Sequence, residues 1–170
     1  MRFLGNIEAK TDSKGRAFLP AVMRKVLQSA GEERLVMRRD VFQPCLVLYP
    51  ESVWNEQMDT LRRRLSRWNR EHQDLYRRFV AEAEIITLDA NGRFLIPRRC
   101  QQQAAIGQDI RFVGMGDTIE MWAAGAADEA LEQTPTLGAA LERLMSSPLN
   151  PPKGDLRMTQ PDSIDDGVTE

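Results

Sequence analysis

The motif D-x-x-G-R occurs twice in the chain, over residues 12–16 and over residues 89–93. Asp12 and Asp89 can accept hydrogen bonds from the N–H groups of a tight turn, and the glycines of the motif tolerate a positive φ. An arginine held by a carboxylate four residues away presents its guanidinium group in a fixed direction, which suits guanine edges and phosphates. The motif therefore indicates either a capped turn that is only structural or a turn that recognises an anion.

The recurrence of arginine helps to separate these two interpretations. A capped turn explains the aspartates and glycines, but it does not require Arg16 and Arg93 at the same position in both copies. Lys14 adds a cation to the first copy, whereas the second copy has Asn91, which hydrogen-bonds without a charge, so the two turns differ in charge. From the residues alone, a surface for DNA or another polyanion and a surface for another protein both remain open. The candidate binding residues are Arg16, Arg93, Lys14 and Asn91, and the residues that orient them are Asp12, Asp89, Gly15 and Gly92.

Catalytic and metal-binding chemistry has little support in the sequence. His72 is the single histidine, and it lies on an apolar helical stripe where a packed or half-exposed side chain is the ordinary state. Cys45 and Cys100 lie far apart and form no CxxC pair, which argues against a zinc site or a disulfide framework. The common phosphate-binding and metalloprotease motifs are absent. We therefore predict that the protein is not an enzyme and that it has no catalytic residue, metal or cofactor.

The two turns belong to a longer internal repeat, in which Asp89 of the second copy aligns with Asp12 of the first. Each copy is expected to form two short strands around the turn, which is typical of a β-hairpin, then a helix and two further strands. Pro20 and Pro97 suit the start of each helix, and Gly31 and Gly107 suit its end. The expected helices span residues 21–30 and 98–106, and the expected strands include residues 34–38, 46–49, 85–88, 94–96, 110–113 and 119–122.

A single copy is too small to bury a sheet well, so we expect the two copies to pair in one β-barrel. Between them, residues 50–84 are expected to be helical, because apolar residues recur at alternating steps of four and three. One long helix and a helical hairpin broken near Asn69 both fit this pattern. We favour the hairpin, since it returns the chain to the start of the second copy. The stripe consists of Trp54, Met58, Leu61, Leu65, Trp68, His72, Leu75 and Phe79.

Composition and charge set the remaining limits. The 170 residues suffice for one domain or two small ones, and no stretch approaches the roughly 18 apolar residues of a membrane span. The N-terminus lacks the apolar region of a signal peptide, so we expect a reducing, cytoplasmic compartment. The net charge is −2, but residues 1–124 carry 20 basic and 16 acidic residues, whereas residues 125–170 carry 3 and 9. The proline-rich, acidic residues 146–170 are predicted to be a disordered tail.

A second basic cluster lies in the predicted helical hairpin. It fits a solvated helix face, which we favour, but it also fits a second DNA surface or a contact with neighbouring subunits. Its members are Arg62, Arg63, Arg64, Arg67, Arg70, Arg77 and Arg78.

The doubled turn and its surroundings resemble the MraZ family. Each turn is followed by an apolar triplet and a proline, and the match includes Phe3-Leu4-Gly5, Leu48-Tyr49-Pro50 and the segment 119–122. This resemblance covers residues 1–130 and implies an α+β, mainly β chain with two SpoVT-AbrB-type (swapped-hairpin) modules in one barrel, a central helical hairpin and a disordered tail. The implied boundaries are 6–53 for the first module, 54–81 for the hairpin, 82–125 for the second module and 146–170 for the tail.

The resemblance also implies a function. Members of this family are cytoplasmic, nucleoid-associated transcriptional regulators, usually repressors, of the division and cell-wall gene cluster. They bind double-stranded DNA at direct repeats upstream of their own gene, as ring-shaped homo-oligomers without a membrane anchor, and Arg16 and Arg93 match their DNA-facing arginines. Two alternatives are an antitoxin-like regulator with a small toxin as partner, and a protein-interaction barrel without a DNA role. An enzyme is a third alternative, for which the sequence offers no catalytic constellation.

Overall fold

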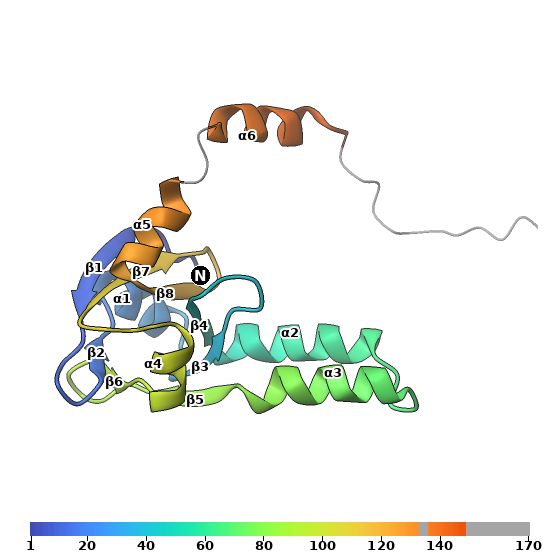
Figure 1. The fold of residues 1–170 in the computed structure, drawn as a ribbon, viewed down its shortest axis with the longest axis horizontal. Helices are drawn as coiled ribbons and strands as arrows, with labels where there is room; N and C mark the ends of the chain where they lie inside the picture. The colour runs from blue at the N-terminus through green and yellow to red at the C-terminus, as the bar shows by residue number, and fades with distance from the viewer. Residues whose placement is uncertain (133–135, 149–170) are drawn as a thin grey trace, which may run out of the picture. The chain divides into compact units, whose positions relative to one another are not determined.

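The structure, a computed structural model, describes residues 1–132 and 136–148 (Figure 1). The chain divides into two units, Met1–Gln133 and Thr134–Glu170, and both sequence repeats lie in the first unit. The fold is α+β. The strands are β1 (Asn6–Lys10), β2 (Arg16–Phe18), β3 (Arg34–Arg39), β4 (Leu46–Pro50), β5 (Glu84–Thr87), β6 (Arg93–Leu95), β7 (Asp109–Gly114) and β8 (Ile119–Ala123). The helices are α1 (Ala21–Ser29), α2 (Glu51–Arg64), α3 (Arg70–Ala81), α4 (Arg98–Gln103), α5 (Ala124–Glu132) and α6 (Leu137–Ser146).

Strands of the first copy pair with strands of the second. The larger sheet has six strands in the order β1-β7-β8-β4-β3-β5, and its neighbours are antiparallel. The pairs β1–β7, β4–β8 and β3–β5 each join the two copies, whereas β3–β4 and β7–β8 lie within one copy. The short strands β2 and β6 form a separate two-stranded sheet, which also joins the copies. The expectation that the copies fold together is therefore confirmed.

The single closed barrel that the sequence led us to expect is not found among the strands that the structure describes. β1 and β5 are the two edges of the six-stranded sheet, and β2 and β6 form a ladder with each other but with no strand of that sheet. The reason lies in the length of β2 and β6, which have three residues each. Pro20 and Pro97 follow them closely, and a proline cannot donate to a strand ladder. These strands therefore do not extend far enough to join the edges.

The D-x-x-G-R turns reverse the chain, but they do not connect simple β-hairpins as predicted. β5 and β6 flank the second turn, yet β5 pairs with β3 and β6 pairs with β2. In the first copy, one isolated bridge between Thr11 and Ala17 joins the two sides of the turn, while β1 pairs with β7. A local turn signal predicts the reversal, whereas the partners of the strands are set by burial against the other copy.

The main core draws residues from both copies. Along β2 and β6 the side chains alternate, so that Ala17 and Phe94 are buried while their neighbours are not. Phe94 packs edge to face on Phe112 of β7, with ring centroids 6.4 Å apart. Each large apolar side chain buried in this way stabilises the fold by roughly 1.5–3 kcal/mol. The largest fully buried side chains are Phe3, Phe112, Leu19, Met23, Leu35, Met37, Leu46, Leu48, Ile96, Ile110, Ile119 and Met121.

The helices of the two repeats begin as predicted but end differently. Each starts directly after its proline, which removes only an N–H group without a helical partner. Gly31 follows α1 with a φ of +68°, as expected of a residue that ends a helix. After α4, however, Ala105 and not Gly107 takes the positive φ, at +49°. The helix ends early because Ile106 turns inward, and its N–H donates to the carbonyl of Gln101 at 2.8 Å.

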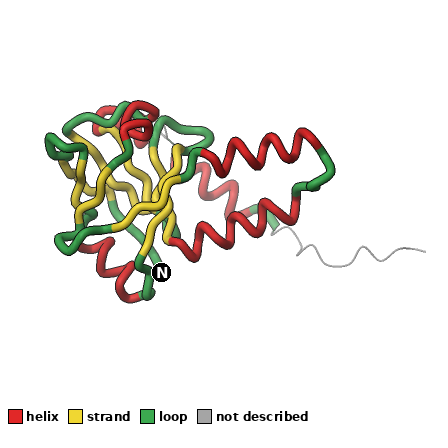
Figure 2. Tube along the Cα trace, turned by 90° about the horizontal axis from the view of Figure 1, so that it is seen from below, coloured by secondary structure: helices red, strands yellow, loops and turns green. Residues whose placement is uncertain are grey.

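The segment between the repeats forms a helical hairpin, as we favoured from the sequence. In Figure 1, α2 and α3 run antiparallel, and Figure 2 shows them leaving the strands on one side. The side chain of Asn69 caps α3 by accepting a hydrogen bond of 3.1 Å from the N–H of His72. Near the sheet, Trp54 stacks on Phe79 with ring centroids 5.5 Å apart and meets the edge of Tyr49 at 5.2 Å. These rings anchor the base of the hairpin.

The apolar stripe of the hairpin is buried only near the sheet. Trp54 is 8% exposed, whereas Leu75 is 52% and Trp68 is 98% exposed. Periodicity identified the helices correctly, but it did not distinguish the packed part of the stripe from the solvent-facing part. The difference follows from position, since Trp68 lies in the connection between α2 and α3, which is at the end of the hairpin away from the strands (Figure 1).

Two helices follow the second copy. α5 packs on the sheet through Ala127, which contacts a small buried cluster with Cys45 and Trp122. α6 belongs to the second unit and is described only by itself. Most of the predicted disordered tail, residues 149–170, lies outside the described residues. No helix of the described ranges is long and apolar enough to cross a membrane.

Candidate functional site

The first turn is built around the carboxylate of Asp12. One carboxylate oxygen accepts hydrogen bonds of 2.9 Å from the backbone N–H groups of Lys14 and Arg16. The other oxygen accepts a hydrogen bond of 2.8 Å from Nε of Arg16. The backbone closes the turn, since the N–H of Gly15 donates to the carbonyl of Asp12 at 3.1 Å. Gly15 has a φ of +78°, which favours glycine at this position.

The second turn repeats this geometry. Oδ1 of Asp89 accepts from the N–H groups of Asn91 and Arg93 at 2.9 Å, and Oδ2 accepts from Nε of Arg93 at 2.8 Å. Gly92 has a φ of +82° and its N–H donates to the carbonyl of Asp89 at 3.0 Å. The two arginines are therefore held in the same way, each by a carboxylate that its own backbone also contacts.

The same hydrogen bonds keep both aspartates ionised. The backbone N–H of Arg16 is the largest cause that lowers the pKa of Asp12, and the side chain of Arg16 and the N–H of Lys14 add to it. In the second turn, the backbone N–H of Arg93 is the largest cause that lowers the pKa of Asp89. Deprotonated carboxylates accept the Nε–H bonds at neutral pH, so the direction of each guanidinium group is fixed under ordinary conditions.

The two turns are joined to each other. The N–H of Leu19 donates to the carbonyl of Gly92 at 3.0 Å, and the N–H of Ile96 donates to the carbonyl of Gly15 at 2.9 Å. Between these bonds, β2 and β6 pair with Ala17 opposite Phe94. The structure thus brings the two predicted turns into one site, although they belong to different repeats and lie far apart in the chain.

The outer face of the β2–β6 pair carries both arginines. Because side chains of opposed residues point to the same face, Arg16 lies with its partner Leu95, and Arg93 lies with its partner Phe18. The side chains of Arg16 and Arg93 are 32% and 27% exposed, and Phe18 and Leu95 are more than half exposed. The guanidinium carbon of Arg93 lies 5.8 Å from the centre of the Phe18 ring. Phe18 and Leu95 were not predicted as site residues, although strict alternation from the arginines would have placed them outward.

Each motif arginine retains donors for a ligand. The hydrogen bonds to Asp12 and Asp89 use Nε, and no bond from the Nη groups of Arg16 or Arg93 is present within residues 1–132 and 136–148. A guanidinium group held by one nitrogen and open at the other two can bind a phosphate or the edge of guanine. The geometry of both turns suits recognition of such a group.

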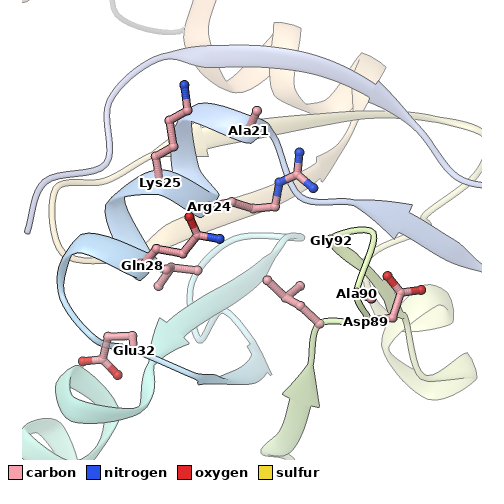
Figure 3. A pocket seen from close by; sticks show the side chains of 10 residues that line it. Ala21, Arg24, Lys25, Gln28, Glu32, Asp89, Ala90 and Gly92 are labelled. Carbon is pink, nitrogen blue, oxygen red and sulfur yellow. The ribbon is translucent and has the colours of Figure 1, made fainter.

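The structure also adds a residue that the sequence analysis missed. Arg24 of α1 extends toward the second turn, and its Nη1 donates to the carbonyl of Asn91 at 2.8 Å (Figure 3). It lines a cavity of about 270 Å³ together with Gln28, Asp89 and Gly92. No local motif marks Arg24, because its contact joins residues 67 positions apart.

The histidine and the two cysteines that the sequence singled out have structural surroundings. Nδ1 of His72 accepts a hydrogen bond of 2.9 Å from the N–H of Ser66, which makes it part of the connection between α2 and α3. Cys45 and Cys100 are buried, and burial raises the pKa of both thiols. In the described part of the chain, no group of three or more His, Cys, Asp and Glu side chains is arranged to hold a metal.

The arginines of the helical hairpin lie apart from the turns. Arg62 stacks over the ring of Tyr76 at 4.5 Å, and Arg77 forms an ion pair with Asp74 at 3.5 Å. Such contacts are those of an ordinary helix surface.

Comparison with known proteins places these features in a family. A family model described as "MraZ protein, putative antitoxin-like" matches residues 2–78. The chain is 57% identical to a protein of Phocaeicola vulgatus over 147 residues, which cover 86% of this chain and 96% of the relative. It is 55% identical to a protein of Bacteroides fragilis, over 85% of this chain and 92% of the relative. It is 54% identical to a protein of Bacteroides thetaiotaomicron, over 86% of this chain and 94% of the relative.

The fold and its two arginine-bearing turns occur here in a chain whose relatives are regulators of transcription. The relatives from Phocaeicola vulgatus and both Bacteroides species carry the name "Transcriptional regulator MraZ". The chain belongs to the MraZ family, as the resemblance of its turns predicted. It is therefore assigned to a class of transcriptional regulators, which is not a class of enzymes.

Proposed function

We propose that this regulator binds double-stranded DNA through the outer face of the β2–β6 pair. The observation that carries this proposal is the matched pair of arginines, each held through Nε by an ionised aspartate and open at both Nη groups. Phosphate contacts would fix the protein on the duplex, and contacts of Arg16 or Arg93 with guanine edges would give sequence preference. Lys14 and Asn91 lie beside these arginines on the turns and contribute to the same contact.

The proposal extends to the arrangement of the complex. The cross-paired strands support two SpoVT-AbrB-type swapped-hairpin modules, over residues 6–53 and 82–125, with the helical hairpin 54–81 between them. One such face makes a small contact, so tight binding requires several subunits on adjacent DNA repeats, an effect of avidity. We infer a ring-shaped homo-oligomer in the cytoplasm, associated with the nucleoid, that represses its own promoter in the division and cell-wall gene cluster through direct repeats.

Fluorescence anisotropy tests this function directly. The purified full chain is titrated onto DNA from upstream of its own gene and onto scrambled DNA of the same composition, at two salt concentrations. The double variant Arg16→Ala/Arg93→Ala runs alongside, with Arg70→Ala as the control for a cation of the helical hairpin. We expect a preference for the native DNA that the double variant loses and Arg70→Ala retains.

Other outcomes would change the assignment. Equal binding to both DNAs that collapses with salt would show a general polyanion surface without sequence preference. Equal losses of DNA affinity in the double variant and in Arg70→Ala would show that the turns are only part of a wider basic surface. Absence of binding to every DNA at low salt would favour a protein-interaction fold.

A second candidate function follows from the description of the family model, which includes the term antitoxin-like. In that case the same fold would be partnered by a small toxin encoded beside its gene. Co-expression with the product of a neighbouring reading frame of toxin size tests this directly. Rescue of growth and a stable complex on gel filtration would support the second candidate. Normal growth of cells that express the neighbouring product without this protein would oppose it.

A further inference from the structure

Arg24 and Gln101 occupy equivalent positions in the two repeats, since each stands at the same distance from the proline that starts its helix. Each lies over the glycine of the opposite copy's turn. A Cβ added to Gly92 would overlap the guanidinium group of Arg24, and a Cβ added to Gly15 would overlap the amide of Gln101. The two helices therefore place side chains of different charge at corresponding places in the site.

The charge difference between Arg24 and Gln101 compensates for the charge difference between the two turns. The first turn has one carboxylate and two cations, from Asp12, Lys14 and Arg16, with the neutral Gln101 above it. The second turn has only Asp89 and Arg93, because Asn91 replaces the lysine. When Arg24 is included, the second turn also has one carboxylate and two cations. The charge difference expected from the turn sequences alone is thus removed by a residue of the other copy.

We propose that Arg24 is a phosphate-binding residue of the second turn and takes the role that Lys14 has in the first. The proposal rests on the proposed DNA-binding function and identifies a contact of that same site. The cation comes from the first repeat but serves the turn of the second. In consequence, both turns present an equal charge to the phosphates of the DNA.

The environment of Arg24 leaves its charge available. Its Nη1 donates to the carbonyl of Asn91, which is a neutral acceptor, and the side chain is half-buried. Among the described residues, no carboxylate lies within ion-pair distance of Arg24. The neighbouring Lys25 extends away from the turn in Figure 3. Arg24 is therefore held against the turn without being neutralised, and Gly92 provides the space for this approach.

The salt dependence of binding separates a phosphate contact from a structural one. For duplex DNA, each phosphate contact contributes about −0.9 to the slope of log affinity against log salt concentration. The test uses a duplex from upstream of the protein's own gene that carries a single repeat unit. The variant Arg24→Gln gives the first repeat the residue that the second repeat has naturally at position 101. We expect weaker binding and a slope that is shallower by about 1 for each engaged subunit.

Two further variants make the test specific. Arg24→Gln combined with Asn91→Lys returns the cation to the turn, as in the first copy, and should restore both the affinity and the slope. Lys25→Gln removes one charge from the same helix without removing a contact to the turn, and should have a smaller effect on the slope. Melting temperatures of all variants are compared, so that loss of folding is distinguished from loss of binding.

The outcomes also distinguish this proposal from the proposed function. If Arg93→Gln weakens binding while Arg24→Gln leaves affinity and slope unchanged, the DNA-binding function stands and the role of Arg24 is refuted. If Arg24→Gln weakens binding but Asn91→Lys does not restore it, Arg24 only positions the turn, which also overturns the proposal. If neither Arg16→Gln nor Arg93→Gln changes binding, the proposed function itself fails.

Discussion

Ile96 donates its backbone N–H to the carbonyl of Gly15 at 2.9 Å, which ties the second repeat to the turn of the first. The reciprocal bond runs from Leu19 to Gly92 at 3.0 Å. Each turn glycine therefore has two roles, since its positive φ shapes the turn and its carbonyl fixes the opposite strand. Any change in one turn is expected to reach the other through these bonds.

We first predict that Gly15→Ala destabilises the protein by about 1–2 kcal/mol, because alanine is strained at a φ of +78° and its Cβ overlaps Gln101. In the double variant with Gln101→Ala, the overlap is removed and only the strain of the backbone remains. The double variant should therefore lose less free energy of unfolding than the sum of the losses in the two single variants. Urea denaturation of the four proteins measures this difference. Gly125→Ala, in open space on α5, is the matched control and should not destabilise.

The second prediction concerns the titration of Asp12. Its pKa is lowered from 3.8, and the largest cause is the backbone N–H of Arg16 rather than the guanidinium group. Because its pKa is lower in the folded state than in the unfolded state, the Asp12 carboxylate stabilises the fold at pH values above its unfolded-state pKa. This contribution is lost as the pH falls through the folded-state pKa. We therefore expect the turns to remain formed throughout the neutral range and to loosen only in acid below pH 3.8.

Carbon-detected NMR of the Asp12 carboxyl group tests the cause. In Arg16→Gln the backbone N–H is retained, so the midpoint should rise only in part and stay below 3.8. A midpoint that returns fully to 3.8 would show that the side chain of Arg16 is the main cause instead.

The sequence predicted the turns because the turns are local. Asp12 and Arg16 are four residues apart, and the carboxylate reaches both the backbone and the guanidinium group within one turn. Arg24 could not be predicted in the same way, since its partner Asn91 lies 67 residues away and no pattern links the two positions. The internal repeat did contain a signal, because Arg24 and Gln101 differ at one equivalent position. This difference can be interpreted only from the structure, in which each helix places a side chain over the turn of the opposite copy.

The elements of the fold were predicted better than their partners. Apolar periodicity and the cap at Asn69 are properties of a few neighbouring residues, so the helical hairpin could be predicted. The choice of β3 as the partner of β5 depends on burial across the whole sheet, and the turn between β5 and β6 suggested a different pairing. The early end of α4 at Gln103 has the same origin, because the partly buried Ile106 packs against the core and overrides the local signal of Gly107.

The third prediction is that Glu120→Gln stabilises the protein at neutral pH. Burial is the main cause that raises the pKa of Glu120 above 4.5, and the charge of Asp40 adds to it, while the hydrogen bond from Trp122 lowers it. At pH values above the folded-state pKa of Glu120, its ionised side chain therefore lowers the free energy of unfolding. This destabilisation disappears as the pH falls through the folded-state pKa toward 4.5. Glutamine keeps an oxygen that can accept the 2.8 Å bond from Nε1 of Trp122.

Thermal unfolding from pH 7 to pH 4 measures this effect. The melting temperature of Glu120→Gln should exceed that of the wild type at pH 7, and the difference should narrow on acidification. Glu129→Gln on the exposed face of α5 controls for the loss of one surface charge. A difference that stays constant with pH would contradict the assignment to Glu120.

The fourth prediction compares two tryptophans of the helical hairpin. Trp54 is 8% exposed and stacks on Phe79 of α3, whereas Trp68 is 98% exposed in the connection between the helices. Trp54→Ala should lower the free energy of unfolding by about 3–5 kcal/mol, since it removes a large buried ring from the base of the hairpin. Trp68→Ala removes an indole ring that is already exposed to solvent, and it should change the free energy of unfolding by less than about 0.5 kcal/mol.

Urea denaturation followed by circular dichroism gives both values without relying on tryptophan emission. Emission then provides an independent check, because loss of the exposed Trp68 should shift the remaining spectrum to shorter wavelength. Similar destabilisation by both substitutions would mean that Trp68 is covered in solution. A stable Trp54→Ala variant would mean that the stack of Trp54 on Phe79 does not hold α2 and α3 against the sheet.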